Sequence, residues 1–106
     1  MNKDWISDMA LWFDDGLEDY TRDGITLKLG CGACPEQYDA FTADGQLVGY
    51  LRLRHGYFRV ECPDVGGERV LEGNPEGDGA FMNEERKEWL DKSIDAILKW
   101  MEKRDV

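Results

Sequence analysis

Five arginine and tyrosine side chains between residues 50 and 59 have the clearest chemical potential in the sequence. Guanidinium groups bind phosphates and carboxylates through paired hydrogen bonds. If His55-Gly56 forms a two-residue turn, Arg52 lies directly opposite Arg59, where like charges repel. A phosphate, a nucleotide or an acidic patch on a partner would relieve that repulsion. The candidate ligand- or partner-binding residues are Tyr50, Arg52, Arg54, Tyr57 and Arg59.

An internal explanation competes with an external anion. Glu61 and Asp39 are expected diagonal to Arg52, one on each neighbouring strand. Carboxylates in those positions would neutralise the arginines within an ordinary surface network. The internal network is the favoured interpretation of the sequence, and an anion-binding face is the alternative.

Cys31 and Cys34 have the C-x-x-C spacing of zinc ribbons and redox-active dithiols. Zinc needs two further ligands, and His55 is expected at the same end of the sheet. Two strand spacings, about 10 Å, separate the two turns at that end, so a loop would have to fold across. Redox chemistry of the thioredoxin type needs a full helix after the second cysteine, and the segment that follows is short. Structural thiols are favoured, with a zinc site of Cys31, Cys34 and His55, or a redox pair, as alternatives.

The acidic segment near residue 80 has the spacing of a calcium-binding loop. Asn74, Glu76, Asp78 and Glu85 fit the first, third, fifth and twelfth positions of such a loop, and Gly79 fits the sixth. However, an asparagine replaces the expected aspartate at the first position, a longer glutamate occupies the third, and no helix leads in. A solvated acidic loop is therefore favoured, and calcium binding is the alternative.

The composition argues against several functional classes. The chain carries 23 acidic and 13 basic residues, a formal charge of -10, and therefore repels nucleic-acid phosphates and anionic membranes. No apolar run approaches the ~18 residues needed to span a bilayer. Three cysteines, an odd number without a secretory signal, predict a cytoplasmic protein. The single histidine on a turn and the lack of a nucleophile–base motif predict no enzyme activity and no required cofactor.

The charge is unevenly distributed. Residues 1–23 sum to -5 and residues 61–85 to -7, whereas residues 24–60 sum to +1. The sequence therefore predicts two surfaces of opposite character on one protein.

Hydrophobic periodicity predicts the elements that position these residues. A 3.6-residue period predicts a helix from Asn2 to about Tyr20, and another follows an N-cap at Asn83. Between them, alternation from Ile25 to Leu29 predicts a strand, followed by a loop over residues 30–35. Two hairpins at Asp44-Gly45 and His55-Gly56, and a short edge strand over residues 68–71, complete the pattern.

Two-residue turns fix a register for these hairpins. The predicted facing pairs are Ala40–Gly49, Tyr38–Leu51, Phe41–Val48, Asp39–Tyr50, Leu53–Phe58, Leu51–Val60, Arg52–Arg59 and Arg54–Tyr57. One face then collects mostly leucine, and the other collects the arginines together with Val48. The predicted fold is a single α+β domain over residues 1–106. It is an antiparallel meander of four to five strands, with the N- and C-terminal helices packed on one face.

The tryptophans suggest a further surface. Trp89 and Trp100 are eleven residues apart and share one side of the C-terminal helix, as Trp5 and Trp12 share one side of the first. A core position is favoured for them. A half-exposed tryptophan at Trp89 or Trp100 would suit a protein partner or a homodimer.

Several short runs are similar to those of small uncharacterised proteins carried by phages and related mobile elements. They are Tyr50 to Gly56, Pro63 to Gly67, Asp78 to Phe81 and Glu85-Arg86. The resemblance implies an accessory role, including the blocking of bacterial immune systems, and it implies no site residues.

Three functional hypotheses follow from the sequence. The first is a non-catalytic inhibitor whose acidic surfaces occupy a basic, nucleic-acid-binding surface of a host defence enzyme. The second is a binder of an anionic small molecule or nucleotide on the arginine and tyrosine face. The third is a structural protein stabilised by zinc or calcium.

Overall fold

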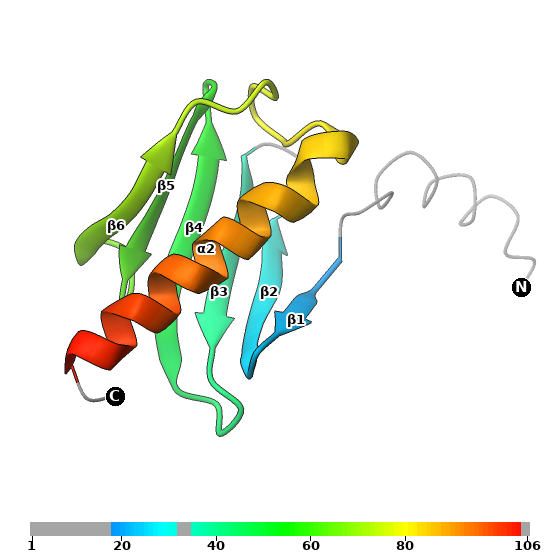
Figure 1. The fold of residues 1–106 in the computed structure, drawn as a ribbon. Coiled ribbons are helices and arrows are strands. Elements are labelled where there is room, and N and C mark those ends of the chain that lie inside the picture. Colours follow the sequence, from blue (N-terminus) through cyan, green and yellow to red (C-terminus); the bar gives the residue numbers. More distant parts are fainter. Residues whose placement is uncertain (1–17, 32–34, 105–106) are drawn as a thin grey trace, which may run out of the picture.

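A computed structural model describes residues 18–31 and 35–104, which form an antiparallel sheet with a long helix on one of its faces (Figure 1). The six strands follow one another in chain order across the sheet. Their bounds are β1 (Tyr20–Arg22), β2 (Ile25–Cys31), β3 (Glu36–Phe41), β4 (Leu47–Arg54), β5 (Tyr57–Cys62) and β6 (Glu68–Gly73), and the helix is α2 (Asn83–Arg104). The α+β class and the antiparallel meander predicted from the sequence are therefore confirmed.

Two tight turns have the backbone of two-residue hairpins, and the one at His55-Gly56 confirms a hairpin that the sequence predicted. Asp23 and Gly24 connect β1 to β2 with φ angles of 53° and 83°, and His55 and Gly56 connect β4 to β5 with 55° and 72°. Two successive positive φ angles give the turn a twist that matches the twist of the flanking strands. These two turns set the register between β1 and β2 and between β4 and β5.

Seven of the eight predicted facing pairs are confirmed, including Arg52 opposite Arg59. The eighth is wrong, because Phe41 pairs with Leu47 and Val48 forms a β-bulge. The connection from β3 to β4 is a five-residue loop rather than a two-residue turn, and the Thr42 N–H donates to the Gln46 carbonyl at 2.9 Å. The bulge places Val48 in the core, although the sequence placed it on the arginine face.

Other predicted boundaries need correction. The sheet has six strands among the described residues rather than four to five, because Tyr20–Arg22 forms the edge strand β1. Tyr20 was expected at the end of a helix, but it pairs with Leu27, and its hydroxyl donates to the Asp91 carboxylate at 2.6 Å. Gly30 and Cys31 extend β2 instead of forming a loop. The remainder of the predicted N-terminal helix, residues 2–17 with Trp5 and Trp12, lies outside the described residues.

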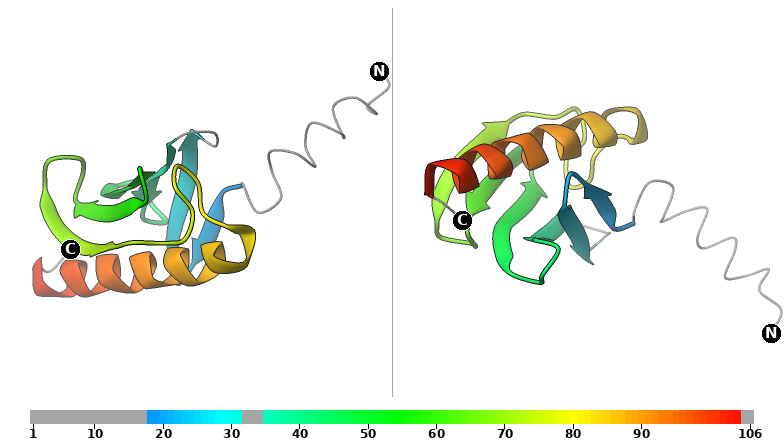
Figure 2. Two further views of the ribbon diagram at one scale, coloured as in Figure 1. Left: turned by 90° about the horizontal axis from the view of Figure 1, so that it is seen from above. Right: turned by 60° about the horizontal axis from the view of Figure 1, so that its bottom comes forward.

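The core lies between the sheet and α2, which runs diagonally across the sheet (Figure 1) and lies on one side of it (Figure 2). Two glycines permit this close approach. A Cβ at Gly49 would lie 2.9 Å from the Ile97 side chain, and one at Gly73 would lie 2.5 Å from the Trp89 ring. Such contacts are shorter than van der Waals distances, so the helix could not pack as closely against larger residues. The helix begins at Asn83, where the sequence predicted its start.

Candidate functional site

The face of the sheet opposite α2, here called the outer face, brings the predicted arginine and tyrosine site together. Strand pairing places Gln37, Arg52, Arg59 and Glu72 in one row across β3 to β6. The adjacent row contains Asp39, Tyr50, Glu61 and Arg69. In the described part of the chain the only helix packs on the other side of the sheet, so no helix there covers these two rows.

Glu61 anchors an internal network on the outer face. It is 6% exposed, and its carboxylate lies 3.2 Å from Arg59 Nε and 3.1 Å from Arg69 Nη2. It also accepts a hydrogen bond from the backbone N–H of Gly66 at 3.0 Å. The Gly66 N–H, followed by Arg69 and Arg59, lowers the pKa of Glu61 below its ordinary value. The internal neutralisation predicted from the sequence therefore exists for Arg59.

Arg52 and Arg54 are different from the other arginines. The chain has seven arginines, and five of them, Arg22, Arg59, Arg69, Arg86 and Arg104, form ion pairs. Among residues 18–31 and 35–104, no carboxylate pairs with Arg52 or Arg54. The Nε atoms of Arg52 and Arg59 are both buried without a hydrogen-bond acceptor among those residues, but Arg59 has Glu61 as a counter-ion.

Neither carboxylate that the sequence placed beside Arg52 pairs with it. Glu61 is held by Arg59, Arg69 and Gly66, as described above. Asp39 lies on β3 in the adjacent row, and burial, together with the nearby Asp64 carboxylate, raises its pKa. The internal ion pairs that the sequence predicted therefore do not include Arg52 among the described residues.

The two tyrosines have fixed hydroxyl groups and flank the unpaired arginines. Tyr50 donates to Gln37 Oε1 at 3.1 Å. Tyr57, which lies opposite Arg54, donates to Glu72 at 2.5 Å and accepts from Arg69 at 2.9 Å. The hydrogen bond to Glu72 raises the pKa of Tyr57. Both hydroxyls are engaged within the sheet, and the Arg69 guanidinium lies over the Tyr57 ring at 5.8 Å.

The structure places two of the three predicted zinc ligands, Cys31 and His55. Cys31 ends β2, His55 is exposed in the turn between β4 and β5, and Cys34 lies outside the described residues. Within the described ranges, no three His, Cys, Asp or Glu side chains group closely enough to hold a metal ion. Zinc binding by these residues stays a prediction. The third cysteine, Cys62, is buried, and burial raises the pKa of its thiol to about 12.

The loop with calcium-like spacing uses its last carboxylate for another purpose. Glu85 accepts hydrogen bonds from the backbone N–H groups of Glu76, Gly77 and Met82 at 2.8–2.9 Å. Burial opposes ionisation of Glu85, but these three donors outweigh it and lower its pKa. Asn74 donates its amide N–H to the Gly56 carbonyl at 3.2 Å, and calcium binding by this loop stays a prediction. Glu76 and Asp78 are exposed, as expected for a solvated loop.

A buried polar network that the sequence analysis missed lies under the same loop. Glu36 is 1% exposed and accepts from Arg86 Nε at 2.8 Å, Arg86 Nη2 at 3.1 Å and the Phe81 N–H at 3.0 Å. The Tyr38 hydroxyl donates to the same carboxylate, and burial together with Glu36 raises the pKa of Tyr38. Arg86 also donates to the Phe81 carbonyl at 2.9 Å. This network fastens the loop and the start of α2 to β3.

The sequence contained a signal for that network. Glu36 alternates with Tyr38 and Ala40, which were both assigned to the buried face. Arg86 precedes Leu90 by four residues on the buried side of α2. A charged residue in each of two apolar patterns requires a partner of opposite charge, because an isolated buried charge is very costly.

Trp89 and Trp100 are mainly core residues. The Trp89 ring stacks on Phe81 with centroids 6.3 Å apart, and it contacts Phe58 edge-on at 5.6 Å. Trp100 is 9% exposed, and the Arg104 guanidinium lies 5.1 Å above its ring. A homodimer through these two residues stays a prediction.

Comparison of the chain with protein-family models, with curated proteins and with solved structures finds no match. Its function is therefore inferred from the geometry of the chain itself. Over the described residues, no helix combines the length and the apolar character that crossing a bilayer requires.

Proposed function

We propose that the protein is a non-catalytic binding protein whose outer face holds an anionic group at Arg52 and Arg54. One observation carries the proposal. In a chain of formal charge -10, these two arginines on one sheet face have no carboxylate partner among residues 18–31 and 35–104, while the other five arginines do. An anion from outside the protein would supply the missing partner.

The arrangement of the two guanidinium groups supports binding of a phosphate or carboxylate. Residues two apart on a strand project from the same face and lie about 7 Å apart, close enough for two arginines to share one polyanion. Arg59, opposite Arg52, raises the local positive potential even though Glu61 partly neutralises it. The buried Nε of Arg52 has no acceptor among the described residues, and a bound anion that draws in the guanidinium would supply one.

The proposal favours a phosphate-bearing ligand, such as a nucleotide or a phosphorylated group on a partner protein. Arginine forks match phosphate oxygens in pairs, and the Tyr50 and Tyr57 rings offer flat surfaces beside them. A carboxylate on an acidic segment of a partner protein would accept from the same guanidinium donors, but it offers fewer oxygens than a phosphate does.

Thermal denaturation with inorganic phosphate, pyrophosphate or ATP tests this function. A ligand at about tenfold its Kd stabilises the native state by about 1.4 kcal/mol, which raises the Tm of a domain of this size by several degrees. The double variant R52A/R54A should lose this shift. The variant K87A/K92A, which removes two exposed charges from α2, should keep it. No stabilisation of the wild type by any of these anions would refute the proposal.

A second candidate function uses the acidic surface. Residues 61–85 sum to -7, and five of their carboxylates are exposed: Glu68, Glu72, Glu76, Asp78 and Glu84. This surface would cover a basic, nucleic-acid-binding surface of a partner enzyme and inhibit it. Pull-down from the native source at low and high salt tests this function. Partner binding that is insensitive to salt, or unaffected by E72Q/E76Q, would count against it.

A further inference from the structure

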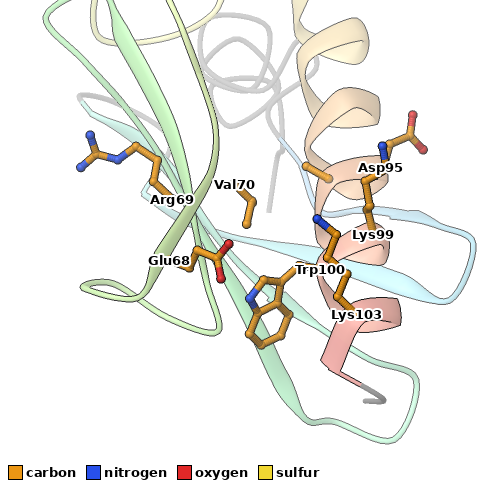
Figure 3. A pocket seen from close by; sticks show the side chains of 8 residues that line it. Glu68, Arg69, Val70, Asp95, Lys99, Trp100 and Lys103 are labelled. Atoms are coloured by element: carbon orange, nitrogen blue, oxygen red, sulfur yellow. The ribbon is translucent and has the colours of Figure 1, made fainter.

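A second candidate site is a groove between β6 and the second half of α2, away from Arg52 and Arg54. The cavity measures about 390 Å³, within the range of small-molecule sites. Val70, Ala96 and the Trp100 ring contribute its apolar surface, and Figure 3 shows Val70 and Trp100. The side chains of Lys99 and Lys103 extend along the same side of α2, one helical turn apart (Figure 3).

The carboxylates of the groove are already neutralised. Asp95 pairs with Arg22 from β1, and Glu68 pairs with Arg104. Lys99 and Lys103 are both exposed and, in the part of the chain that the structure describes, pair with no carboxylate. The groove therefore contains two free ammonium groups beside an apolar surface.

Trp100 adds an unused hydrogen-bond donor. Its indole is about nine-tenths buried, and its Nε1 atom has no acceptor among the described residues. Tryptophan N–H groups usually find a partner when buried, so this donor at the cavity wall is an exception. Two free ammonium groups therefore line the groove, and a buried indole N–H without an acceptor among the described residues lies in its wall.

We propose that this groove binds a small carboxylate with an aromatic or branched aliphatic body. The carboxylate lies between Lys99 and Lys103, which are spaced to share one anion. The apolar body covers Val70, Ala96 and the part of the indole ring that stays exposed. A bare inorganic anion would leave the apolar surface uncovered, and a neutral apolar molecule would leave the ammonium groups unpaired.

Proton–nitrogen NMR with 3-phenylpropionate as the probe tests this site. The indole N–H resonance of Trp100, assigned with W100F, should shift and saturate at millimolar probe. Acetate, which lacks the apolar body, and 3-phenylpropan-1-ol, which lacks the charge, should each bind at least tenfold more weakly, because each loses one class of contact.

Variants separate this groove from the outer face. K99A/K103A changes two exposed residues and should weaken 3-phenylpropionate binding at least tenfold. K87A/K92A, on the same helix but outside the groove, and R52A/R54A should bind as the wild type does. The proposal is overturned if the Trp100 resonance does not move, or if K99A/K103A binds the probe as well as wild type. Equal binding of the alcohol would overturn it too.

Discussion

Arg86 and Arg52 each have a buried guanidinium Nε, but among the described residues only that of Arg86 has a hydrogen-bond acceptor. At the start of α2, Arg86 and the carboxylate of Glu36 meet in a closed network, in which that carboxylate accepts four hydrogen bonds. On the outer face, Arg52 has a buried Nε without an acceptor among the described residues. The closed network uses its donors to hold the fold together. The open one leaves the Arg52 Nε donor without a partner among the described residues.

The largest expected effect follows from breaking the closed network. The substitution Glu36→Ala leaves the buried guanidinium of Arg86 without its counter-charge, and removing one partner of a buried pair typically costs about 3–5 kcal/mol. Denaturation by urea should show this loss in the free energy of unfolding. In the double variant E36L/R86M no uncompensated charge remains, so its loss should be smaller than that of E36A. A loss below about 1 kcal/mol for E36A would contradict a closed, structural network.

Two tyrosine-to-phenylalanine substitutions, one in each region, compare the loss of a single hydrogen bond. Tyr38→Phe removes one hydrogen bond from the buried Glu36 carboxylate and should cost about 1.5–3 kcal/mol, the usual range for a charged acceptor. Tyr50→Phe on the outer face removes a bond to the neutral Gln37 amide in a half-buried setting and should cost about 0.5–1 kcal/mol. Equal losses of unfolding free energy in the two variants would show that burial does not separate the two regions.

The pH dependence of stability tests the paired part of the outer face. Because the pKa of Glu61 is lower in the folded state, its contribution is fully present above its ordinary pKa of 4.5. That contribution decreases as pH falls below 4.5 and is lost once pH has passed through the lowered folded value. Urea denaturation between pH 7 and pH 3 should therefore show a shallower loss for E61Q than for wild type. Identical profiles would contradict the ion pairs of Glu61 with Arg59 and Arg69.

The smallest effect is expected for Arg52. The substitution Arg52→Ala removes an unpaired guanidinium and its repulsion with Arg59, so stability should change by no more than about 0.5 kcal/mol. Arg59→Ala should cost about 0.5–1 kcal/mol more, because Glu61 loses one of its two arginines. Thermal denaturation of the two variants without ligand makes the comparison. If Arg52→Ala is the more destabilising variant, Arg52 serves the fold rather than a ligand.

Much of the sheet was predictable because its signals are local. The alternation of Leu51 and Leu53 with the arginines, and the His55-Gly56 turn, are enough to place Arg52 opposite Arg59. The bulge at Val48 was not predictable from alternation, because one extra residue changes the face of a side chain without changing the composition of the strand.

The contacts within the sites were less predictable than their locations. Glu36 and Arg86 are 50 residues apart, and only the packing of α2 on the sheet brings them together. Glu61 binds Arg59 and Arg69 rather than Arg52 because the Gly66 N–H and the β6 strand orient its carboxylate. Tertiary packing decides these choices, so the sequence predicted which arginines share a face but not which of them stays unpaired.

The side-chain resonance of Arg52 Nε–H tests the central claim most directly. Titration of the wild-type protein with pyrophosphate, followed by proton–nitrogen NMR, should shift this resonance downfield until it saturates, because the guanidinium gains an anionic acceptor. The resonance of Arg86 Nε–H, already bonded to Glu36, should stay in place. An Arg52 resonance that does not move, or that moves no more than that of Arg86, would contradict an anion-binding role for the outer face.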